Sequence, residues 1–323
     1  MKKILLSAAV ASTLSLASYG FADGPIDSTI YGKVNISVVN ADNGSTDQWK
    51  LNSNASRLGV KGKTEIADGL YAVYKAEFEI AVDDGDTKNG KTFNQRNIMA
   101  GIRGDFGTVW AGNHDSPTKL AQNKIDLFND LEGDIKNTFE GENRVSNIVA
   151  YTSPNMNGFA TTVAMMPGEG ADLDGDGNDD TGLTDGISYS VSYTKDNLYI
   201  AVAGDQDVDS QDLMRIVAQY KMDALKLGVM YQQNEDNLGT KDESGFFVSA
   251  AYSLDDKTTL KAQYGSIEDD ADGDKEDSLS LGADYKLAKG TKVYVFYTDN
   301  TDSSVGEADS DATAYGLGME HKF

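Results

Sequence analysis

The sequence predicts an all-β fold, a sixteen-stranded antiparallel β-barrel that crosses a lipid membrane. Three observations predict it. Apolar and polar residues alternate along many extended segments, the connections between these segments alternate between short and long, and only four prolines occur in 323 residues. Because proline cannot donate to a strand ladder, its scarcity suits a chain that is almost entirely sheet.

The alternation is clearest between Leu70 and Ile80. The even-numbered residues of this segment are all apolar, whereas Lys75, Glu77 and Glu79 lie on the odd-numbered side. Successive side chains of a strand point to opposite faces, so the segment has one oily face and one mostly wet face. A strand that crosses lipid needs apolar residues only at alternate positions.

Sixteen such segments follow one another between turn signals. They start near Thr29, Ala55, Leu70, Gln95, Thr108, Arg144, Phe159, Ile187, Leu198, Leu213, Leu225, Phe246, Thr259, Ser278, Thr291 and Ala312. Short connections, such as residues 67–69, 105–107, 195–197 and 288–290, alternate with long ones, such as residues 41–54, 168–186 and 266–277. Short periplasmic turns and long outer loops are typical of outer-membrane barrels. A soluble β-sandwich has the same residue alternation, but its loops follow no such rule.

Aromatic residues gather near the ends of these segments, where a tyrosine ring and its hydroxyl suit the border between lipid and water. They are Tyr31, Phe78, Phe106, Tyr151, Phe159, Tyr193, Tyr220, Tyr252, Tyr285, Tyr297 and Tyr315. The last segment places Thr313, Tyr315, Leu317, Met319, His321 and Phe323 on its outward parity.

The first 22 residues are interpreted as a secretory signal peptide. Lys2 and Lys3 precede a short apolar run, and small residues stand at Gly20 and Ala22. The run is too short for a membrane-spanning helix. Cleavage after Ala22 leaves a single barrel domain, residues 23–323. Loss of the two lysines moves the formal charge from −24 to −26.

So acidic a chain is not expected to bind nucleic acid, which requires clustered basic residues. The sequence has no cysteine, and its two histidines, His114 and His321, lie far apart. Neither disulfide bonds nor a zinc site is therefore expected.

Four stretches, in order, resemble the general (non-specific) outer-membrane porins of Gram-negative bacteria. They are Tyr31-Gly32-Lys33, residues 56–62 (SRLGVKG), residues 95–112 with the run GIRGDFGTVWAG, and residues 143–154 with NRVSN and YTSP. The resemblance covers nearly all of the chain after the signal peptide. The terminal Phe323 is similar to the signal that such barrels present to their assembly machinery.

The resemblance implies a water-filled channel in the outer membrane through which small hydrophilic solutes and ions diffuse passively, without catalysis or a cofactor. It implies a homotrimer that contacts lipid and lipopolysaccharide. The barrel assembly machinery would bind the last strand, with Tyr315, Leu317, Met319 and Phe323 as the signal residues.

The resemblance also implies a third loop, about residues 114–143, that folds into the lumen and narrows it. The acids of this loop are Asp126, Asp130, Glu132 and Asp134. Across a water-filled gap they would face a basic cluster carried over as Lys33, Arg57, Arg96 and Arg144. The resulting transverse field would favour polar solutes over lipophilic ones.

Residue parity supports an inward direction for three of these basic residues. Lys33, Arg57 and Arg144 each lie opposite the apolar parity of their own segment. Arg96 shares the parity of Ile98 and Ile102, which predicts that it points outward and so conflicts with the resemblance.

The acidity of the chain favours a cation preference, since charged rings tune selectivity in pores. One acidic stretch, with Asp172, Asp174, Asp176 and Asp180, resembles the first half of a calcium loop, and calcium or magnesium could bridge it to another outer loop. Position twelve of that loop is Leu183 instead of a bidentate glutamate, so a solvated acidic loop is the favoured interpretation.

Three alternative functions stay open. A substrate-specific channel for sugars would use a run of aromatic residues, but the tryptophans are Trp49, expected in the first outer loop, and Trp110. A channel for phosphate would use a lysine-rich lumen, which so acidic a chain disfavours. An outer-membrane hydrolase would need a base and a nucleophile oriented in space, which the adjacent His114, Asp115 and Ser116 cannot provide. An adhesin with a blocked lumen is the third.

Overall fold

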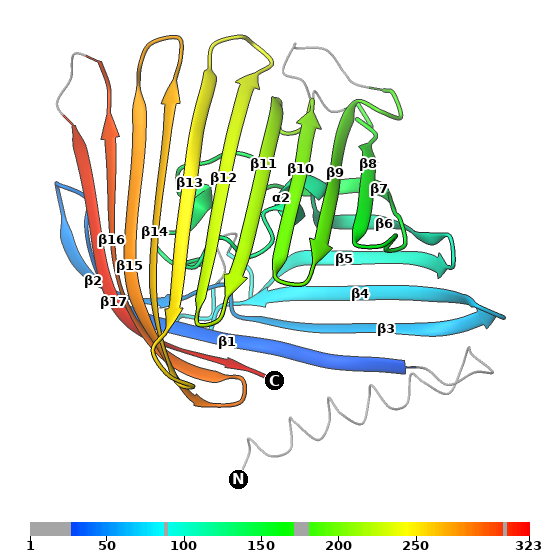
Figure 1. The fold of residues 1–323 in the computed structure, drawn as a ribbon, viewed down its shortest axis with the longest axis horizontal. Helices are drawn as coiled ribbons and strands as arrows, with labels where there is room; N and C mark the ends of the chain where they lie inside the picture. The colour runs from blue at the N-terminus through cyan, green and yellow to red at the C-terminus, as the bar shows by residue number, and fades with distance from the viewer. Residues whose placement is uncertain (1–26, 87–89, 171–180, 306–308) are drawn as a thin grey trace.

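Antiparallel strands form one closed sheet in the computed structural model, which describes residues 27–86, 90–170, 181–305 and 309–323 (Figure 1). The strands are β1 (Asp27–Asp42), β2 (Asp47–Ser53), β3 (Arg57–Ala67), β4 (Leu70–Ile80), β5 (Phe93–Gly104), β6 (Gly107–Asp115), β7 (Arg144–Thr152), β8 (Phe159–Met166), β9 (Gly186–Lys195), β10 (Leu198–Gln206), β11 (Gln211–Met222), β12 (Leu225–Asp236), β13 (Asp242–Ser253), β14 (Thr258–Asp269), β15 (Lys275–Ala288), β16 (Thr291–Ser303) and β17 (Ser310–Lys322). Helix α2 (Pro117–Ala121) and the 3-10 helix η2 (Ile135–Asn137) lie between β6 and β7.

The seventeen strand segments make sixteen barrel strands, because β2 and β3 form one interrupted strand. Both pair with β1, β2 along Ile36–Asp42 and β3 along Asp27–Lys33. Between them Ala55 has φ 46°, and the Ser56 hydroxyl accepts a hydrogen bond from the Asn35 amide at 2.9 Å in place of the ladder. The predicted sixteen-stranded antiparallel barrel is confirmed.

The prediction of a long loop is wrong at two places, where the connection is short. The first turn spans only residues 43–46, and Trp49 lies in β2, where its exposed ring meets Tyr315 edge-on at 5.7 Å. Likewise β14 runs to Asp269 and β15 begins at Lys275, so the loop expected over residues 266–277 is short. Strand pairing continues beyond the lipid level, where both faces of a strand are polar and the alternation that marks the strand disappears.

Pairing of the first strand with the last closes the barrel. The register runs from Lys33↔Lys322 to Asp42↔Thr313. It ends where Gly32 and Phe323 exchange two backbone hydrogen bonds of 3.0 and 3.1 Å. Closure removes the unpaired strand edges that an open sheet would leave.

The apolar parity faces outward. Leu227, Val229 and Tyr231 on β12 are 41–47% exposed, whereas Gly228 and Met230 between them are buried. A soluble sandwich would bury the apolar face, so this distribution fits a barrel surrounded by lipid. Tyr31 is an exception among the predicted interfacial aromatics, because it points inward and its hydroxyl donates to Glu77. No helix in the described parts of the chain has the length and apolarity needed to cross a membrane.

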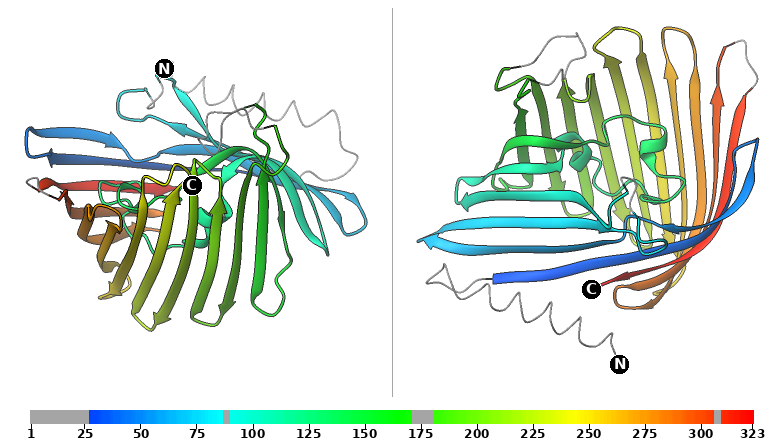
Figure 2. Two further views of the ribbon diagram at one scale, coloured as in Figure 1. Left: turned by 90° about the horizontal axis from the view of Figure 1, so that it is seen from above. Right: turned by 180° about the vertical axis from the view of Figure 1, so that it is seen from behind.

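The buried apolar residues lie inside the barrel. Residues 116–143, here called the inner loop, leave the wall after β6 and cross the enclosed space beside the inner face of β10–β14 (Figure 2). Their contacts with the wall form two of the three buried apolar clusters. The inner loop therefore acts as a core inside an otherwise hollow sheet.

Gly32 gives a test of barrel closure. An alanine Cβ there would lie 2.3 Å from Phe323 Cζ and 2.8 Å from the Arg57 carbonyl oxygen, so Gly32→Ala should destabilise the closed barrel by about 1–3 kcal/mol. The temperature at which the folded band disappears in unheated detergent gels should fall. Ser28→Ala, at an exposed position of the same strand, should leave it unchanged. Equal gel mobility and stability for Gly32→Ala would contradict this account of closure.

Candidate functional site

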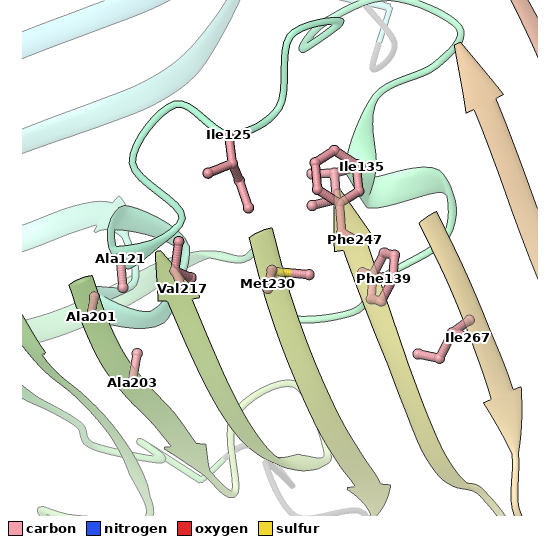
Figure 3. Packing of buried hydrophobic residues seen from close by; sticks show 10 residues of the cluster. All are labelled: Ala121, Ile125, Ile135, Phe139, Ala201, Ala203, Val217, Met230, Phe247 and Ile267. Carbon is pink, nitrogen blue, oxygen red and sulfur yellow. The ribbon is translucent and has the colours of Figure 1, made fainter. Parts of the chain in front are cut away.

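The inner loop is held against the wall by apolar side chains. Ser116 caps α2 by accepting a hydrogen bond from the Lys119 amide, and proline at the first helical turn suits a helix start. Beyond the helix, Ile125, Ile135 and Phe139 are at most 2% exposed. They pack on wall residues of β10–β14, namely Ala201, Ala203, Val217, Met230, Phe247 and Ile267 (Figure 3). The loop is therefore a docked element of the barrel interior.

Polar side chains from the wall bind the loop backbone at several points. Arg215 on β11 is fully buried and reaches the Glu142 carboxylate at 2.6 Å and the Glu140 carbonyl at 2.7 Å. Gln263 on β14 accepts from the Leu127 amide at 2.8 Å and donates to the Gly133 carbonyl at 2.6 Å. Burial outweighs the attraction of Arg215 and raises the pKa of Glu142.

Two of the predicted loop acids stabilise the loop itself. Asp126 accepts from the amides of Phe128 and Ile135, at 2.9 and 3.2 Å. Asp134 accepts from the Asp130 and Lys136 amides and from the Lys136 ammonium group. Burial, with a contribution from Asp134, raises the pKa of Asp126 to about 7. Neither carboxylate contacts the predicted basic cluster.

Asp130 is the loop acid that meets the basic cluster. Its backbone takes the left-handed conformation, with φ 69°. Its carboxylate lies 2.7 Å from Lys33 Nζ and 2.8 Å from an Arg57 guanidinium nitrogen. Burial opposes its ionisation, but Lys33 and Arg57 outweigh burial and hold the pKa of Asp130 below its ordinary value. Direct contact thus replaces the expected water-filled gap at this point.

The ion pairs continue along the wall from Arg57. Glu77 on β4 is 4% exposed and has four partners. Arg57 approaches it at 3.8 Å, Lys75 at 3.7 Å and Arg96 at 3.1 Å, and the Tyr31 hydroxyl donates to it at 2.9 Å. Glu77 is therefore the central carboxylate of the basic cluster.

Arg96 points inward, contrary to the parity prediction. The pairing of β4 with β5 shifts register between Ala76 and Phe78, so Arg96 and Asn97 both face the interior in succession. Such a bulge reverses the parity of the strand beyond it. Arg96 then reaches Glu79 as well, at 3.0 Å.

The remaining predicted residues lie elsewhere, on the wall, on the inner loop and on the outer face of the barrel. Arg144 on β7 pairs with Asp115 at 2.8 Å and with Asn97 at 2.9 Å, one step along the wall from Arg96. Glu132 accepts from Asn52 at 3.0 Å. Tyr315, Leu317, Met319 and Phe323 are 40–62% exposed on the outer face of the last strand or at its end.

Some sequence predictions fall outside this site. Asp172, Asp174, Asp176 and Asp180 lie outside the described residues, as does the predicted signal peptide. The side chains of His114, Asp115 and Ser116, considered for a hydrolase, contact three different partners. His114 packs on Trp110, Asp115 binds Arg144 and Ser116 caps α2.

Sequence reasoning missed the residues that hold the site together, including Glu77, Asp115, Arg215 and Gln263. All four face the interior, Glu77, Arg215 and Gln263 from within their strands and Asp115 from the end of β6. An open lumen does not require large polar side chains at such positions. Their presence is a signal that could have indicated contact with an inserted segment.

A closed barrel with an apolar outside, a charged inside and an inserted loop defines a transmembrane channel. A family model described as Gram-negative porin matches residues 6–305. The chain belongs to this family. It is an outer-membrane porin, which forms a channel for passive diffusion.

Relatives of known sequence and structure agree with this assignment. Outer membrane porin protein 32 of Delftia acidovorans is 26% identical over 366 residues, covering 100% of both chains. Major outer membrane protein P.IB of Neisseria lactamica is 24% identical with the same coverage. Two solved structures share the fold. An anion-selective porin from Comamonas acidovorans has a TM-score of 0.79 at 22% identity, covering 93% of this chain and 100% of its own. The trimer form of OmpT from Vibrio cholerae has a TM-score of 0.71 at 17% identity, covering 92% and 99%.

Neutralising Glu77 should disturb the basic cluster. In Glu77→Gln, Arg57, Lys75 and Arg96 lose their shared counter-charge, so the free energy of unfolding should fall by about 1–3 kcal/mol. The pore should also shift toward anions. Thermal unfolding followed by circular dichroism, together with the reversal potential in a salt gradient, measures both effects. Glu79→Gln is the matched control and should show smaller changes, because among the described residues Glu79 forms an ion pair with Arg96 alone.

Proposed function

We propose that the level of Asp130 is the constriction of the pore. The supporting observation is the contact of its carboxylate with Lys33 and Arg57, which joins the loop tip to the wall. Arg96 and Arg144 continue the basic lining beside it, and Glu132 adds an acid on the loop. In this proposal Asp126 and Asp134 act indirectly, by fixing the shape of the loop that carries Asp130.

We further propose that the pore prefers small anions. Below the inner loop, on the side of the short turns, a cavity of about 680 Å³ is lined by seven Lys or Arg residues and four Asp or Glu residues. The basic residues are Lys33, Arg57, Lys124, Lys226, Lys261, Lys292 and Lys322. A neighbouring cavity of about 330 Å³ adds Lys61, Lys63, Lys75 and Arg103 against a single acid, Asp27. Charge of one sign along the walls of a pore enriches the opposite ion.

The acidity of the whole chain does not oppose this proposal, because many acids lie elsewhere. Acidic residues gather at the long-loop ends of neighbouring strands, where the register places Glu235 beside Asp242, Glu243 beside Asp269 and Glu276 beside Asp302. The cation preference was expected from the net charge alone, which takes no account of this separation of acidic and basic residues along the barrel axis. The description of the Comamonas acidovorans relative as anion-selective also supports an anion preference here.

The sign of the reversal potential across a planar bilayer with a potassium chloride gradient tests the anion preference. The wild-type protein should show the sign for chloride, and the opposite sign would overturn the proposal. Replacing Lys226, Lys261 and Lys292 together by glutamine should shift the potential toward cations, since the cavity then loses three positive charges. Lys195→Gln, at the exposed end of β9, should leave the reversal potential unchanged.

The same measurement tests the constriction. Replacing Arg57 and Arg144 together by glutamine should also raise the cation preference, because both groups line the narrowest level in this proposal. An unchanged reversal potential would remove them from the constriction.

For assembly we propose a homotrimer in a bilayer with lipopolysaccharide, inserted through recognition of the last strand by the barrel assembly machinery. The trimer form of OmpT supports the oligomer, and the outward exposure of Tyr315, Leu317, Met319 and Phe323 supports recognition of that strand. The proposal requires no cofactor, metal ion or catalytic step. Conductance that rises in groups of three equal steps on insertion supports the trimer, and single steps with a monomer mass in detergent would exclude it.

A further inference from the structure

Three glycines of the wall, two of them buried and Gly282 half-buried, lie directly under the apolar anchors of the inner loop. A Cβ added to Gly228 on β12 would lie 2.7 Å from Ile125 Cγ2. One added to Gly265 on β14 would lie 2.8 Å from Phe139 Cε2. One added to Gly282 on β15 would lie 2.8 Å from Phe128 Cε1. Each anchor therefore lies where a wall side chain would project, and at Gly228 and Gly282 the wall atoms Ser249 Oγ and the Val295 carbonyl oxygen are also close, at 2.6 and 2.8 Å.

Close approach, and not backbone conformation, explains these glycines. None of the three has a φ in the positive range, so their strand backbone is one that any residue adopts. Glycine within a strand is otherwise unfavourable, by roughly 0.5–1 kcal/mol relative to alanine. Optimal contacts between carbon atoms are about 3.5–4.0 Å, so a methyl group at these sites would displace the anchor by about 1 Å.

The loop has little freedom to move sideways in response. Phe128 is buried among Val39, Tyr294 and Phe296, with the Lys261 ammonium group 4.5 Å from its ring centre. On the backbone, Lys226 donates to the Lys124 carbonyl and Gln263 binds both Leu127 and Gly133. These bonds lie on both sides of Phe128. The remaining direction is away from the wall, into the lumen.

We propose that Gly228, Gly265 and Gly282 set the distance between the inner loop and the wall, and thereby the width of the pore and the size of solute that it admits. They are positioning residues, since they act through the loop and touch no solute. This inference rests on the proposed constriction at the level of Asp130. The constriction proposal concerns the charge of the pore, whereas this inference concerns its width.

The test is the single-channel conductance of Gly265→Ala, because the three atoms nearest to its new Cβ all belong to the Phe139 and Phe247 side chains. The displaced loop should narrow the pore, lowering conductance by an amount on the order of tens of per cent. The rate at which neutral sugars of increasing size enter proteoliposomes should fall most for the largest. The closed barrel should still form, with its thermal transition somewhat lower, because the added methyl group overpacks the contact between Phe139 and the wall.

A second substitution separates this effect from general distortion. Phe139→Leu removes the ring atoms that the new methyl group would meet, so Gly265→Ala combined with Phe139→Leu should recover wild-type conductance. Gly245→Ala is the wall control, because the atoms nearest to its new Cβ belong to Ser266 and Ile267 on the neighbouring strand. Unchanged conductance in Gly265→Ala, no recovery in the double variant, or an equal loss in Gly245→Ala would each overturn the inference.

These outcomes are independent of ion preference. If the Arg57 and Arg144 variant shifts the reversal potential while Gly265→Ala leaves conductance unchanged, the constriction stands and the role of the glycines fails. If neither variant changes the current, the constriction itself lies elsewhere.

Discussion

The structure depends on the closure of its hydrogen-bond ladder. A backbone group left unpaired in hydrocarbon costs several kcal/mol, so a sheet in lipid is stable only when its first and last strands meet. Here β1 pairs with β17, and the final residue, Phe323, completes the ladder at Gly32. Once the wall is closed, outward side chains face lipid, and inward side chains line either the lumen or the contact with the inner loop. The alternation of the sequence then becomes a division between membrane and lumen.

The interior of such a barrel has no core of its own, and the inner loop supplies one. Ile125, Phe128, Ile135 and Phe139 bury apolar surface against strands that are distant in sequence, while Arg215 and Gln263 bind the loop backbone. Removing one partner of a buried ion pair, such as Arg215 with Glu142, leaves an uncompensated charge and is strongly unfavourable. The loop is thus held by packing and by polar contacts at once, which fixes the position of Asp130.

Much of the fold could be predicted from the sequence, because alternation is a local property of each strand. Fifteen of the sixteen predicted starting positions lie within four residues of the observed ones, and the exception, near Ala55, is the strand that is interrupted at that residue. The site was harder to predict from the sequence. A one-residue bulge reversed the direction of Arg96, and no local pattern distinguishes Asp130, which meets the wall, from Asp126 and Asp134, which bind their own loop. Such choices depend on contacts between segments far apart in sequence.

The separation of charge along the barrel has a consequence for transport in the two directions. Acidic residues at the long-loop ends and lysines near the short turns give the channel a fixed electrical polarity along its axis. An ion that enters from one side meets the two belts in the opposite order from an ion that enters from the other. The strand register thus builds an asymmetry of fixed charge into the passage itself.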